Sequence, residues 1–421
     1  MRILHVTQGY WPAIGGTELL IQRVSEELVQ RFGDEVTVFT TNCYNGEAFF
    51  NPALPRLQPG WEELNGVRIR RFEVSSQVGR YARRLQGIPY RFRLPFNAYL
   101  RALASGPVIP GLRRAIRDDP ADVLAASSFP LLHMFATLKA AADTGRPCVL
   151  HGGLHPEDPW GFERPMIYRA IKRVIYIANT QYEAEYVIRR GALPERVFVV
   201  GVGVDLDRFE RIRPDEARQR LGFDDGPVVG FVGQLGGHKG VDTLLRAMPL
   251  VWREAPRAKL LVAGSRTMFA PQVERMIEAL PASQRRKVKL LCDFADEETP
   301  HLFADADVIA YPSGYESFGI AFLEAWAAGK PVIGCRSGAI PTVIAEGVDG
   351  LLVPYQDEAM LAAAIVRLLR DPAMALAFGE AGRRKVRARY TWRRVAERFR
   401  RIYSIALGVP ARALSETAIE A

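Results

Sequence analysis

The sequence has few cysteines and no long apolar run. Its four cysteines are far apart and show no Cys-x-x-Cys spacing, which argues against a disulfide framework or a zinc site and predicts free thiols in a reducing cytoplasm. No stretch reaches eighteen consecutive apolar residues, so we expect no membrane-spanning helix. The apolar run after Met1 is too short for a secretory signal and predicts a strand. Without repeats or low-complexity tracts, these features indicate a cytoplasmic globular protein.

Positive charge is in slight excess over negative charge, and it is unevenly distributed along the chain. Lys and Arg number 56 against 47 Asp and Glu in 421 residues, a formal net charge of +9. Residues 68–117 carry twelve arginines and a single acid, Glu73, while residues 367–401 carry twelve Lys or Arg and three acids. The remainder of the chain is therefore acidic. No nucleic-acid-binding module is recognisable, so the two basic segments need another explanation.

Short apolar runs alternate with longer amphipathic stretches, which is typical of parallel sheets covered by helices on both faces. The expected strands are 2–7, 35–40, 67–72, 122–126, 147–151, 174–178, 197–200, 228–233, 258–263, 287–291, 307–311, 331–335 and 350–353. The expected helices are 17–31, 130–142, 181–190, 240–254, 318–329, 358–370 and Trp392 to about Leu407. Because the alternation restarts near residue 205, we expect two α/β domains in tandem, with a basic insertion over about 68–117 in the first.

Two loops of the first expected domain have ligand-binding features. Gly15 and Gly16 follow the first strand and open a helix, where the backbone can approach an anion closely. The spacing is not G-x-G-x-x-G, and paired glycines are also ordinary turn residues. His151 ends a strand and precedes two glycines, at the strand end where open parallel sheets bind ligands; a structural histidine is the alternative.

Two loops of the second expected domain combine glycines with charge. Lys239 lies between glycines in the loop from Gly233 to Gly240, which resembles a phosphate loop without its Walker spacing; an exposed loop lysine is the alternative. Glu316 and Glu324 flank an expected helix start near Ser317. If both residues were helical, their spacing of eight would place Glu316 and Glu324 within about 80° of each other around the helix axis, so the two carboxylates could hold one ligand. The alternative is a helix-dipole charge and a solvated surface glutamate.

The order and spacing of these motifs resemble the retaining glycosyltransferases of the GT-B architecture, family four. The resemblance runs nearly end to end and includes, besides the loops above, Asn179 to Tyr182, Val204 to Phe209, Ala327 to Val332 and Gly347 to Val353. The Glu-x₇-Glu block leading into Glu-Ala-x-Ala-x-Gly-x-Pro-Val is its most specific part.

The resemblance implies two Rossmann-like domains facing each other across a cleft, with residues 1–202 on the acceptor side and 203–390 binding a nucleotide sugar. Residues 391–421 would form a crossing helix and tail. His151, Glu316 and Lys239 would be catalytic. The implied donor-binding residues are Gly15, Gly16, Gly233, Gln234, Lys239, Arg266, Phe294, Glu316, Ser317, Phe318, Gly319, Ile320 and Glu324.

The resemblance also implies a hexose donor linked to UDP or GDP, no metal and no cofactor, and retention of configuration. The acceptor would be a glycan, a lipid-linked sugar or a small molecule, as in cell-envelope or polysaccharide biosynthesis. Tyrosines and phenylalanines alternate with arginines over residues 80–117, so an anionic membrane surface on the inner face of the cell membrane is a further expected partner; a solvated helical insertion is the alternative.

Two positions depart from the family pattern. Gln234 stands where arginine is usual, and we expect Arg266 to supply the missing positive charge. Thr342 stands where an acid is common. The other functions considered are a GT-B phosphorylase or sugar-nucleotide epimerase, and a non-catalytic membrane-associated binding protein.

Overall fold

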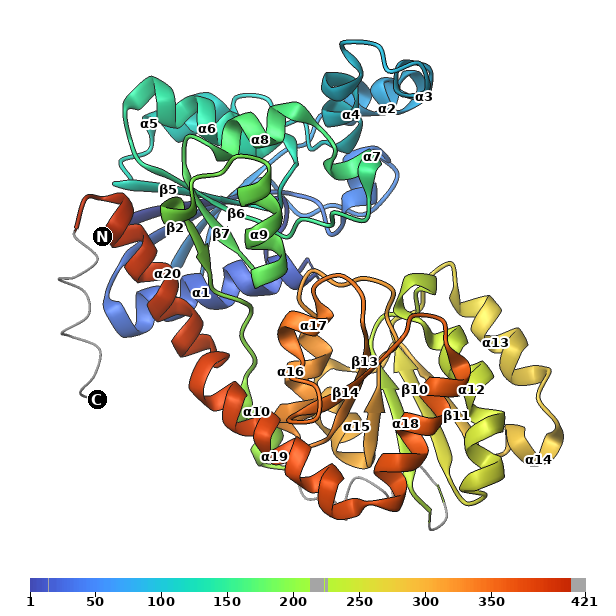
Figure 1. Ribbon diagram of the computed structural model, residues 1–421. Coiled ribbons are helices and arrows are strands. Elements are labelled where there is room, and N and C mark those ends of the chain that lie inside the picture. The colour runs from blue at the N-terminus through green and yellow to red at the C-terminus, as the bar shows by residue number, and fades with distance from the viewer. Residues whose placement is uncertain (14, 213–222, 224–225, 410–421) are drawn as a thin grey trace. The chain divides into compact units, whose positions relative to one another are not determined.

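A computed structural model describes residues 1–409 except 14, 213–222 and 224–225 (Figure 1). The chain divides into an N-terminal unit, Met1–Val202 together with the residues from Trp392 onward, and a C-terminal unit, Gly203–Thr391. Ile14 of the glycine loop and the expected tail over 410–421 lie outside the described residues. The two units are described separately below.

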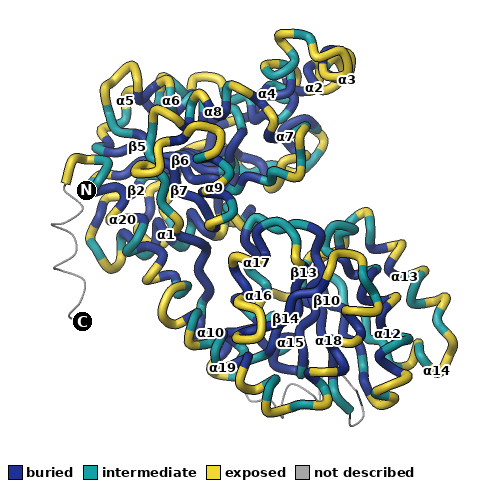
Figure 2. The backbone as a smooth tube through the Cα atoms, in the orientation of Figure 1, coloured by how far each residue is buried: buried dark blue, intermediate teal, exposed yellow. Residues whose placement is uncertain are grey.

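The N-terminal unit is built on an eight-stranded sheet in the order β3-β4-β2-β1-β5-β6-β7-β8. In that order the strands are Gly60–Leu64, Val67–Phe72, Glu35–Thr41, Arg2–Val6, Val123–Ser127, Cys148–His151, Ile175–Ala178 and Val197–Val199. All neighbouring strands pair in parallel except β3, which is antiparallel to β4. The central strands are buried along nearly their whole length (Figure 2), as parallel strands covered on both faces require. Strand β3 is an exposed edge.

Helices cover this sheet and extend from it. They are α1 (Gly16–Phe32), η1 (Gly46–Phe49), α2 (Ser76–Leu85), α3 (Gly87–Arg91), α4 (Asn97–Ser105), α5 (Leu112–Asp118), α6 (Leu132–Thr144), α7 (Pro159–Phe162), α8 (Pro165–Ile171), α9 (Gln181–Arg189), η2 (Pro194–Arg196) and α20 (Trp392–Ala406). Helix α1 ends at Gly33, whose φ of 62° is the left-handed conformation that glycine adopts without a steric penalty.

Helix α20 returns the chain to the N-terminal unit after the whole of the C-terminal unit, and it packs beside α1 (Figure 1). Its buried side chains recur at helical spacing and include Val395, Phe399 and Tyr403. The Tyr403 hydroxyl lies 2.9 Å from His5 Nε2, so β1 and α20 share a buried hydrogen bond. The crossing helix expected from the resemblance is therefore present.

The C-terminal unit contains a six-stranded, entirely parallel sheet in the order β11-β10-β9-β12-β13-β14. In that order the strands are Val288–Cys292, Lys259–Gly264, Val228–Val232, Val308–Ala310, Val332–Cys335 and Gly350–Val353. Its helices are α10 (Leu206–Glu210), η3 (Gly237–Lys239), α12 (Val241–Glu254), α13 (Ala270–Glu278), α14 (Ala282–Arg285), η4 (Asp296–Glu298), α15 (Thr299–Asp305), α16 (Ile320–Ala327), α17 (Ile340–Val343), α18 (Glu358–Arg370) and α19 (Pro372–Arg389). The expected α/β class is confirmed; the second sheet is entirely parallel, and the first is parallel except for its edge strand β3.

Two expectations about local structure are wrong. The basic insertion does not begin at residue 68, because Val67–Phe72 is β4, a strand inside the sheet whose Val67 and Ile69 are fully buried. The helix expected to begin near Ser317 begins at Ile320. Periodicity also missed the edge strand β3, whose Glu-rich sequence has no apolar face to detect.

Candidate functional site

Strand order places the candidate site of the C-terminal unit. Numbered along the chain, the six strands follow the doubly wound order 3-2-1-4-5-6. The chain builds the sheet outward in one direction from strand 1 to strand 3 and in the opposite direction from strand 4 to strand 6, so the reversal lies between strands 1 and 4. Those strands are β9 and β12, which pair directly. Ligands of such sheets bind outside the carboxyl ends of the strands at this reversal. The loops that follow β9 and β12 are the two that the sequence singled out, Gly233–Gly240 and 311–319.

The loop after β9 is held against the loop after β12 by contacts that leave no room for side chains. A Cβ at Gly233 would lie 2.3 Å from the Tyr311 hydroxyl, and one at Gly240 would lie 2.1 Å from the carbonyl oxygen of Pro312. Gly240 also has a φ of 75°. The Gly314 amide donates to the His238 carbonyl at 2.8 Å. The glycines are therefore required for the two loops to meet.

Lys239 and Glu316 form an ion pair where these loops meet. The ammonium nitrogen lies 2.7 and 2.8 Å from the two carboxylate oxygens, and the side chains are only 17% and 9% exposed. The sequence instead suggested that Glu316 shares a helical face with Glu324. That expectation is wrong, because α16 begins four residues after Glu316 and the glutamate lies on the preceding loop.

Glu324 lies within α16 in an apolar setting. Its neighbours Phe322, Leu323 and Trp326 are fully buried, and the carboxylate accepts no hydrogen bond from the part of the chain that the structure describes. Burial raises the pKa of Glu324 to about 7, with a further increase from Asp296 and a decrease from Arg208. A partly buried carboxylate without a hydrogen bond costs stability, which makes Glu324 a candidate for contact with a ligand.

The backbone before α16 offers hydrogen-bond donors. The amides of Ser317, Phe318 and Gly319 have no acceptor among the described residues, and the amide of Ile320 belongs to the first turn of the helix. Such donors, together with the positive end of the helix dipole, favour an anionic ligand. Lys239 lies in the other loop, and its ion pair with Glu316 holds the ammonium against the loop that carries these amides.

Three other predicted donor-binding residues are more exposed. Gln234 is exposed in the loop after β9, and Phe294 is half-buried in the loop after β11. The Arg266 guanidinium pairs with Glu274 at 2.7 Å and lies 3.9 Å from Asp293. Two carboxylates therefore already neutralise the Arg266 guanidinium. An arginine that replaced the positive charge missing at Gln234 would instead be expected without such partners.

In the N-terminal unit, Gly15 and Gly16 begin α1 beside an acid that the sequence analysis did not select. A Cβ at Gly15 would lie 2.2 Å from a carboxylate oxygen of Glu18, and that carboxylate accepts from the Gln8 amide at 2.8 Å. Burial raises the pKa of Glu18. The glycine allows the Glu18 side chain to fold back onto the loop after β1.

His151 ends β6 and is almost fully buried. Its Nε2 lies 2.9 Å from Asn179 Oδ1, and its ring lies 5.6 Å from that of Phe399. Burial lowers the pKa of His151 to about 4, so the imidazole is neutral at pH 7. With Nε2 donating to Asn179, Nδ1, which has no partner among the described residues, can accept one hydrogen bond.

A buried glutamate that the sequence analysis missed organises the chain beside His151. The Glu183 carboxylate accepts from the amides of Gly153, Leu154 and Asn179 at 2.8–3.0 Å and from the Tyr176 hydroxyl at 2.6 Å. It also follows the helix-capping residue Thr180 by three positions, the Thr-x-x-Glu spacing of a capping box. That spacing is the sequence signal that could have identified it.

Comparisons with known proteins place both units in one group of enzymes. Residues 14–208 match the family model described as Glycosyltransferase Family 4, and residues 213–385 match Glycosyl transferases group 1. D-inositol 3-phosphate glycosyltransferase of Saccharomonospora viridis is 33% identical over 239 residues, which cover 55% of each chain. A GDP-mannose-dependent monoacylated alpha-(1-6)-phosphatidylinositol monomannoside mannosyltransferase of Corynebacterium glutamicum is 34% identical over 48% of this chain and 54% of its own. The matches thus span about half the length of these relatives.

Solved structures share the fold over 96–97% of this chain. Anabaena Alr3699/HepE in complex with UDP and glucose has a TM-score of 0.69 at 22% identity, covering 96% of this chain and 99% of its own. Sucrose-phosphate synthase from Thermosynechococcus elongatus has a TM-score of 0.71, also at 22% identity, covering 97% and 100%. At this level of identity the likeness concerns the fold.

Proposed function

Because the chain belongs to the GT-B glycosyltransferases of family four, we propose that it transfers a hexose from a UDP- or GDP-linked donor to a hydroxyl of an acceptor, with retention and without a metal. The observation that carries this proposal is the Lys239–Glu316 pair beside unpaired amides at the reversal between β9 and β12. A nucleoside diphosphate sugar presents the complementary groups, an anionic diphosphate followed by sugar hydroxyls.

The diphosphate would be stabilised by the Lys239 ammonium and the amides from Ser317 to Ile320. As the bond to the sugar breaks, negative charge grows on the leaving phosphate, and fixed cations and amide donors stabilise it without reorganisation. In other enzymes a divalent cation stabilises the negative charge of the diphosphate. The Lys239 ammonium and these amides can stabilise the same charge here, which supports the proposed metal independence. Glu324 would accept hydrogen bonds from the ribose hydroxyls, and its apolar setting strengthens them.

The ion pair keeps Glu316 and Lys239 in place before the donor binds. An incoming diphosphate competes with Glu316 for the ammonium, and the displaced carboxylate can then accept hydrogen bonds from the hydroxyls of the transferred sugar. Donor binding would therefore exchange one ion pair for two ligand contacts. The side chains need to move little, because both already lie at the meeting point of the loops.

Retention is proposed to proceed by attack on the same face of the sugar, with the leaving phosphate taking the acceptor proton. His151 is a poor general base, since burial lowers its pKa to about 4. Its role would be to accept a sugar hydroxyl at Nδ1 while Asn179 holds Nε2. Gly16 would approach the diphosphate through its backbone.

The acceptor is proposed to be a hydroxyl of a glycan, a lipid-linked sugar or a small molecule. The mannosyltransferase relative has a phosphatidylinositol-based acceptor in its name, and the inositol 3-phosphate relatives have a small anionic one. Both are phosphorylated, which fits a basic N-terminal unit. A cytoplasmic enzyme that works at the cell membrane would meet either kind.

The test is release of nucleoside diphosphate from a panel of UDP- and GDP-sugars. We expect one donor to be cleaved, and Glu316→Ala to abolish most of that release. Glu278→Ala, which removes an exposed carboxylate on α13, is the matched control and should leave the rate unchanged. Turnover without nucleoside diphosphate would favour a phosphorylase or epimerase, and donor binding without turnover would favour a non-catalytic binding protein.

Glu324 should make donor binding and stability depend on pH in opposite ways. The pKa of Glu324 is about 7 in the folded protein, against 4.5 for an ordinary glutamate such as that of the unfolded chain. Between these two pH values the folded protein therefore holds a proton that the unfolded chain releases. Stability then falls as pH rises through this window, by about 3 kcal/mol in total. Donor affinity should rise, because the ionised carboxylate is the better acceptor for ribose hydroxyls.

Glu324→Gln is the variant that tests both effects. It should unfold at a higher temperature than the parent protein at pH 8 but not at pH 5, and its KM for the donor should be raised at pH 8. If the difference in unfolding temperature were the same at both pH values, the raised pKa would be refuted.

A further inference from the structure

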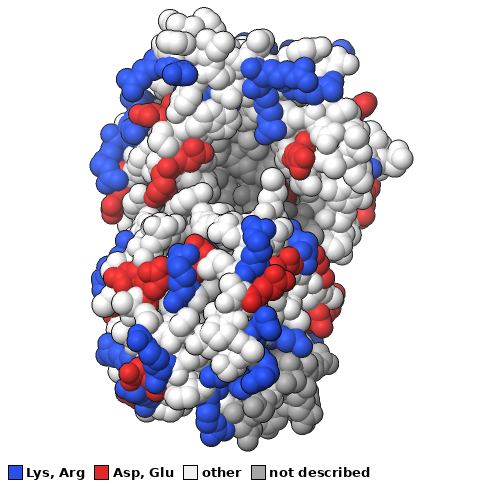
Figure 3. Space-filling view, turned by 90° about the vertical axis from the view of Figure 1, so that its right-hand side faces the viewer, with Lys and Arg blue, Asp and Glu red and all other residues white. Residues whose placement is uncertain are grey.

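The helices α2, α3 and α4 carry a dense group of exposed apolar side chains. Eight large ones are between 38% and 69% exposed, namely Val78, Tyr81, Leu85, Ile88, Tyr90, Phe92, Phe96 and Tyr99. In Figure 3, which looks at the side of the molecule on which these helices lie, charged side chains flank an uncharged area at the top. So many large apolar side chains exposed on neighbouring helices indicate a partner.

This surface is not the result of a poorly packed segment. The opposite side of α2 is packed closely, since Ala82 is buried and a Cβ at Gly79 would lie 2.7 Å from the Phe50 ring. Phe50 belongs to a small separate core with Cys43, Ala48, Phe49 and Val74. The helices therefore have a core beneath them, and the outward apolar side chains are additional to it.

The distribution of side chains around α2 is that of a helix lying in an interface. At about 100° per residue, Val78, Tyr81 and Leu85 fall within about 60° of one another. The buried Gly79 and Ala82 lie to one side of this stripe, and Arg80 and Arg84 lie to the other. A helix with neighbouring buried, apolar and cationic faces can rest at the boundary between headgroups and acyl chains.

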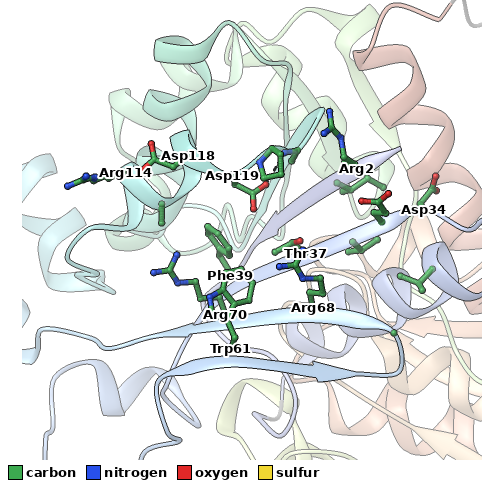
Figure 4. A pocket seen from close by; sticks show the side chains of 18 of the residues that line it. Arg2, Asp34, Thr37, Phe39, Trp61, Arg68, Arg70, Arg114, Asp118 and Asp119 are labelled. Atoms are coloured by element: carbon green, nitrogen blue, oxygen red, sulfur yellow. Dashed lines mark hydrogen bonds and ion pairs between the residues drawn. The ribbon is translucent and has the colours of Figure 1, made fainter.

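The arginines of the basic segment separate into two groups by their partners. Several have structural roles: in β4, Arg68 and Arg70 stack on Trp61 at 5.2 and 5.4 Å (Figure 4), and Arg101 donates to the carbonyls of Pro159, Trp160 and Glu163. Arg83 lies 3.8 Å from the centre of the Phe50 ring. These arginines are used within the fold.

Four arginines of α2, α3 and the turn that follows α3 remain available. Arg80, Arg84, Arg91 and Arg93 are exposed and have no ion pair or hydrogen bond to any side chain that the structure describes. No Asp or Glu occurs between Glu73 and Asp118 to neutralise them. Four unpaired cations beside eight exposed apolar side chains match an anionic surface with an apolar interior.

We propose that the outer face of α2, α3 and α4 docks on an anionic lipid bilayer. Tyr81, Leu85, Ile88 and Phe92 enter the headgroup region, and the four unpaired arginines contact lipid phosphates. Each such cation contributes about 1 kcal/mol near an anionic bilayer, and aromatic side chains favour this depth. Docking goes beyond the transfer reaction and does not depend on it. None of the described helices is long and apolar enough to cross the bilayer, so the contact is peripheral.

The experiment measures sedimentation of the full chain with vesicles of phosphatidylcholine, alone or containing phosphatidylglycerol. We expect binding to the anionic vesicles only. Changing Arg80, Arg84, Arg91 and Arg93 to Glu should weaken it at least about 100-fold. Changing Leu85, Ile88 and Phe92 to Ser should weaken it also, because charge alone does not hold the face in the interface.

The matched control changes Arg253, Arg275, Arg286 and Arg367 to Glu. These arginines are exposed in the C-terminal unit, and the change in net charge is the same. The control should keep its vesicle binding, and all variants should unfold at the parent temperature. Equal binding by the four-glutamate variant and the parent, or no binding to anionic vesicles, would overturn the proposal; in the second case a protein partner would be the remaining occupant. Nucleoside diphosphate release is measured separately, so failure of the proposed activity would not be mistaken for failure of docking.

Discussion

Lys239→Ala should lower kcat for sugar transfer by about 100- to 1,000-fold. The ammonium is held at the meeting of the two loops by Glu316 at 2.7 and 2.8 Å. Removing one fixed group that stabilises developing charge has an effect of that size in other enzymes. The measurement is steady-state release of nucleoside diphosphate at saturating donor.

The conservative and control variants separate charge from structure. Lys239→Arg keeps the positive charge and should recover part of the lost rate. Lys139→Ala removes an exposed lysine from α6 and should leave kcat unchanged. Unchanged turnover in Lys239→Ala would show that the diphosphate is stabilised elsewhere.

Glu183→Ala should lower the free energy of unfolding by about 3–5 kcal/mol. The substitution leaves three backbone amides and the Tyr176 hydroxyl without their buried acceptor, and each such loss costs about 1–3 kcal/mol before any relaxation. It also releases the backbone of Asn179, whose side chain holds His151. Transfer activity should therefore fall together with stability.

Two variants of the same helix identify the cause. Glu185→Ala removes an exposed carboxylate two residues away and should shift the unfolding midpoint by less than about 0.5 kcal/mol. Glu183→Gln keeps the volume and one acceptor oxygen, so its loss should lie between the other two. Denaturant unfolding of all three proteins measures the order. A Glu183→Ala protein as stable as Glu185→Ala would contradict the proposed role.

The sequence was informative about elements whose pattern is local. Buried parallel strands are short apolar runs, and all thirteen expected strands overlap observed ones because every residue of such a strand carries the signal. The glycines at the two ends of the loop after β9 were also visible, since only glycine permits the close approach found at Gly233 and Gly240. The helix start expected near Ser317 lies at Ile320, because the N-cap is Gly319, whose missing side chain makes no capping hydrogen bond, whereas Ser317 has the residue type that usually caps a helix.

The sequence by itself determined two α/β domains and the chemical character of the loops that end their strands. Tertiary structure alone decided which side chains meet. Lys239 and Glu316 are 77 residues apart, and they pair because β9 and β12 are neighbours in the sheet. The same holds for the basic segment, where Arg83 and Arg101 have partners within the fold while Arg80 and Arg84 have none among the described residues. The sequence gives the number and order of the charged residues, but contacts between residues far apart in the chain decide which of these charges are neutralised.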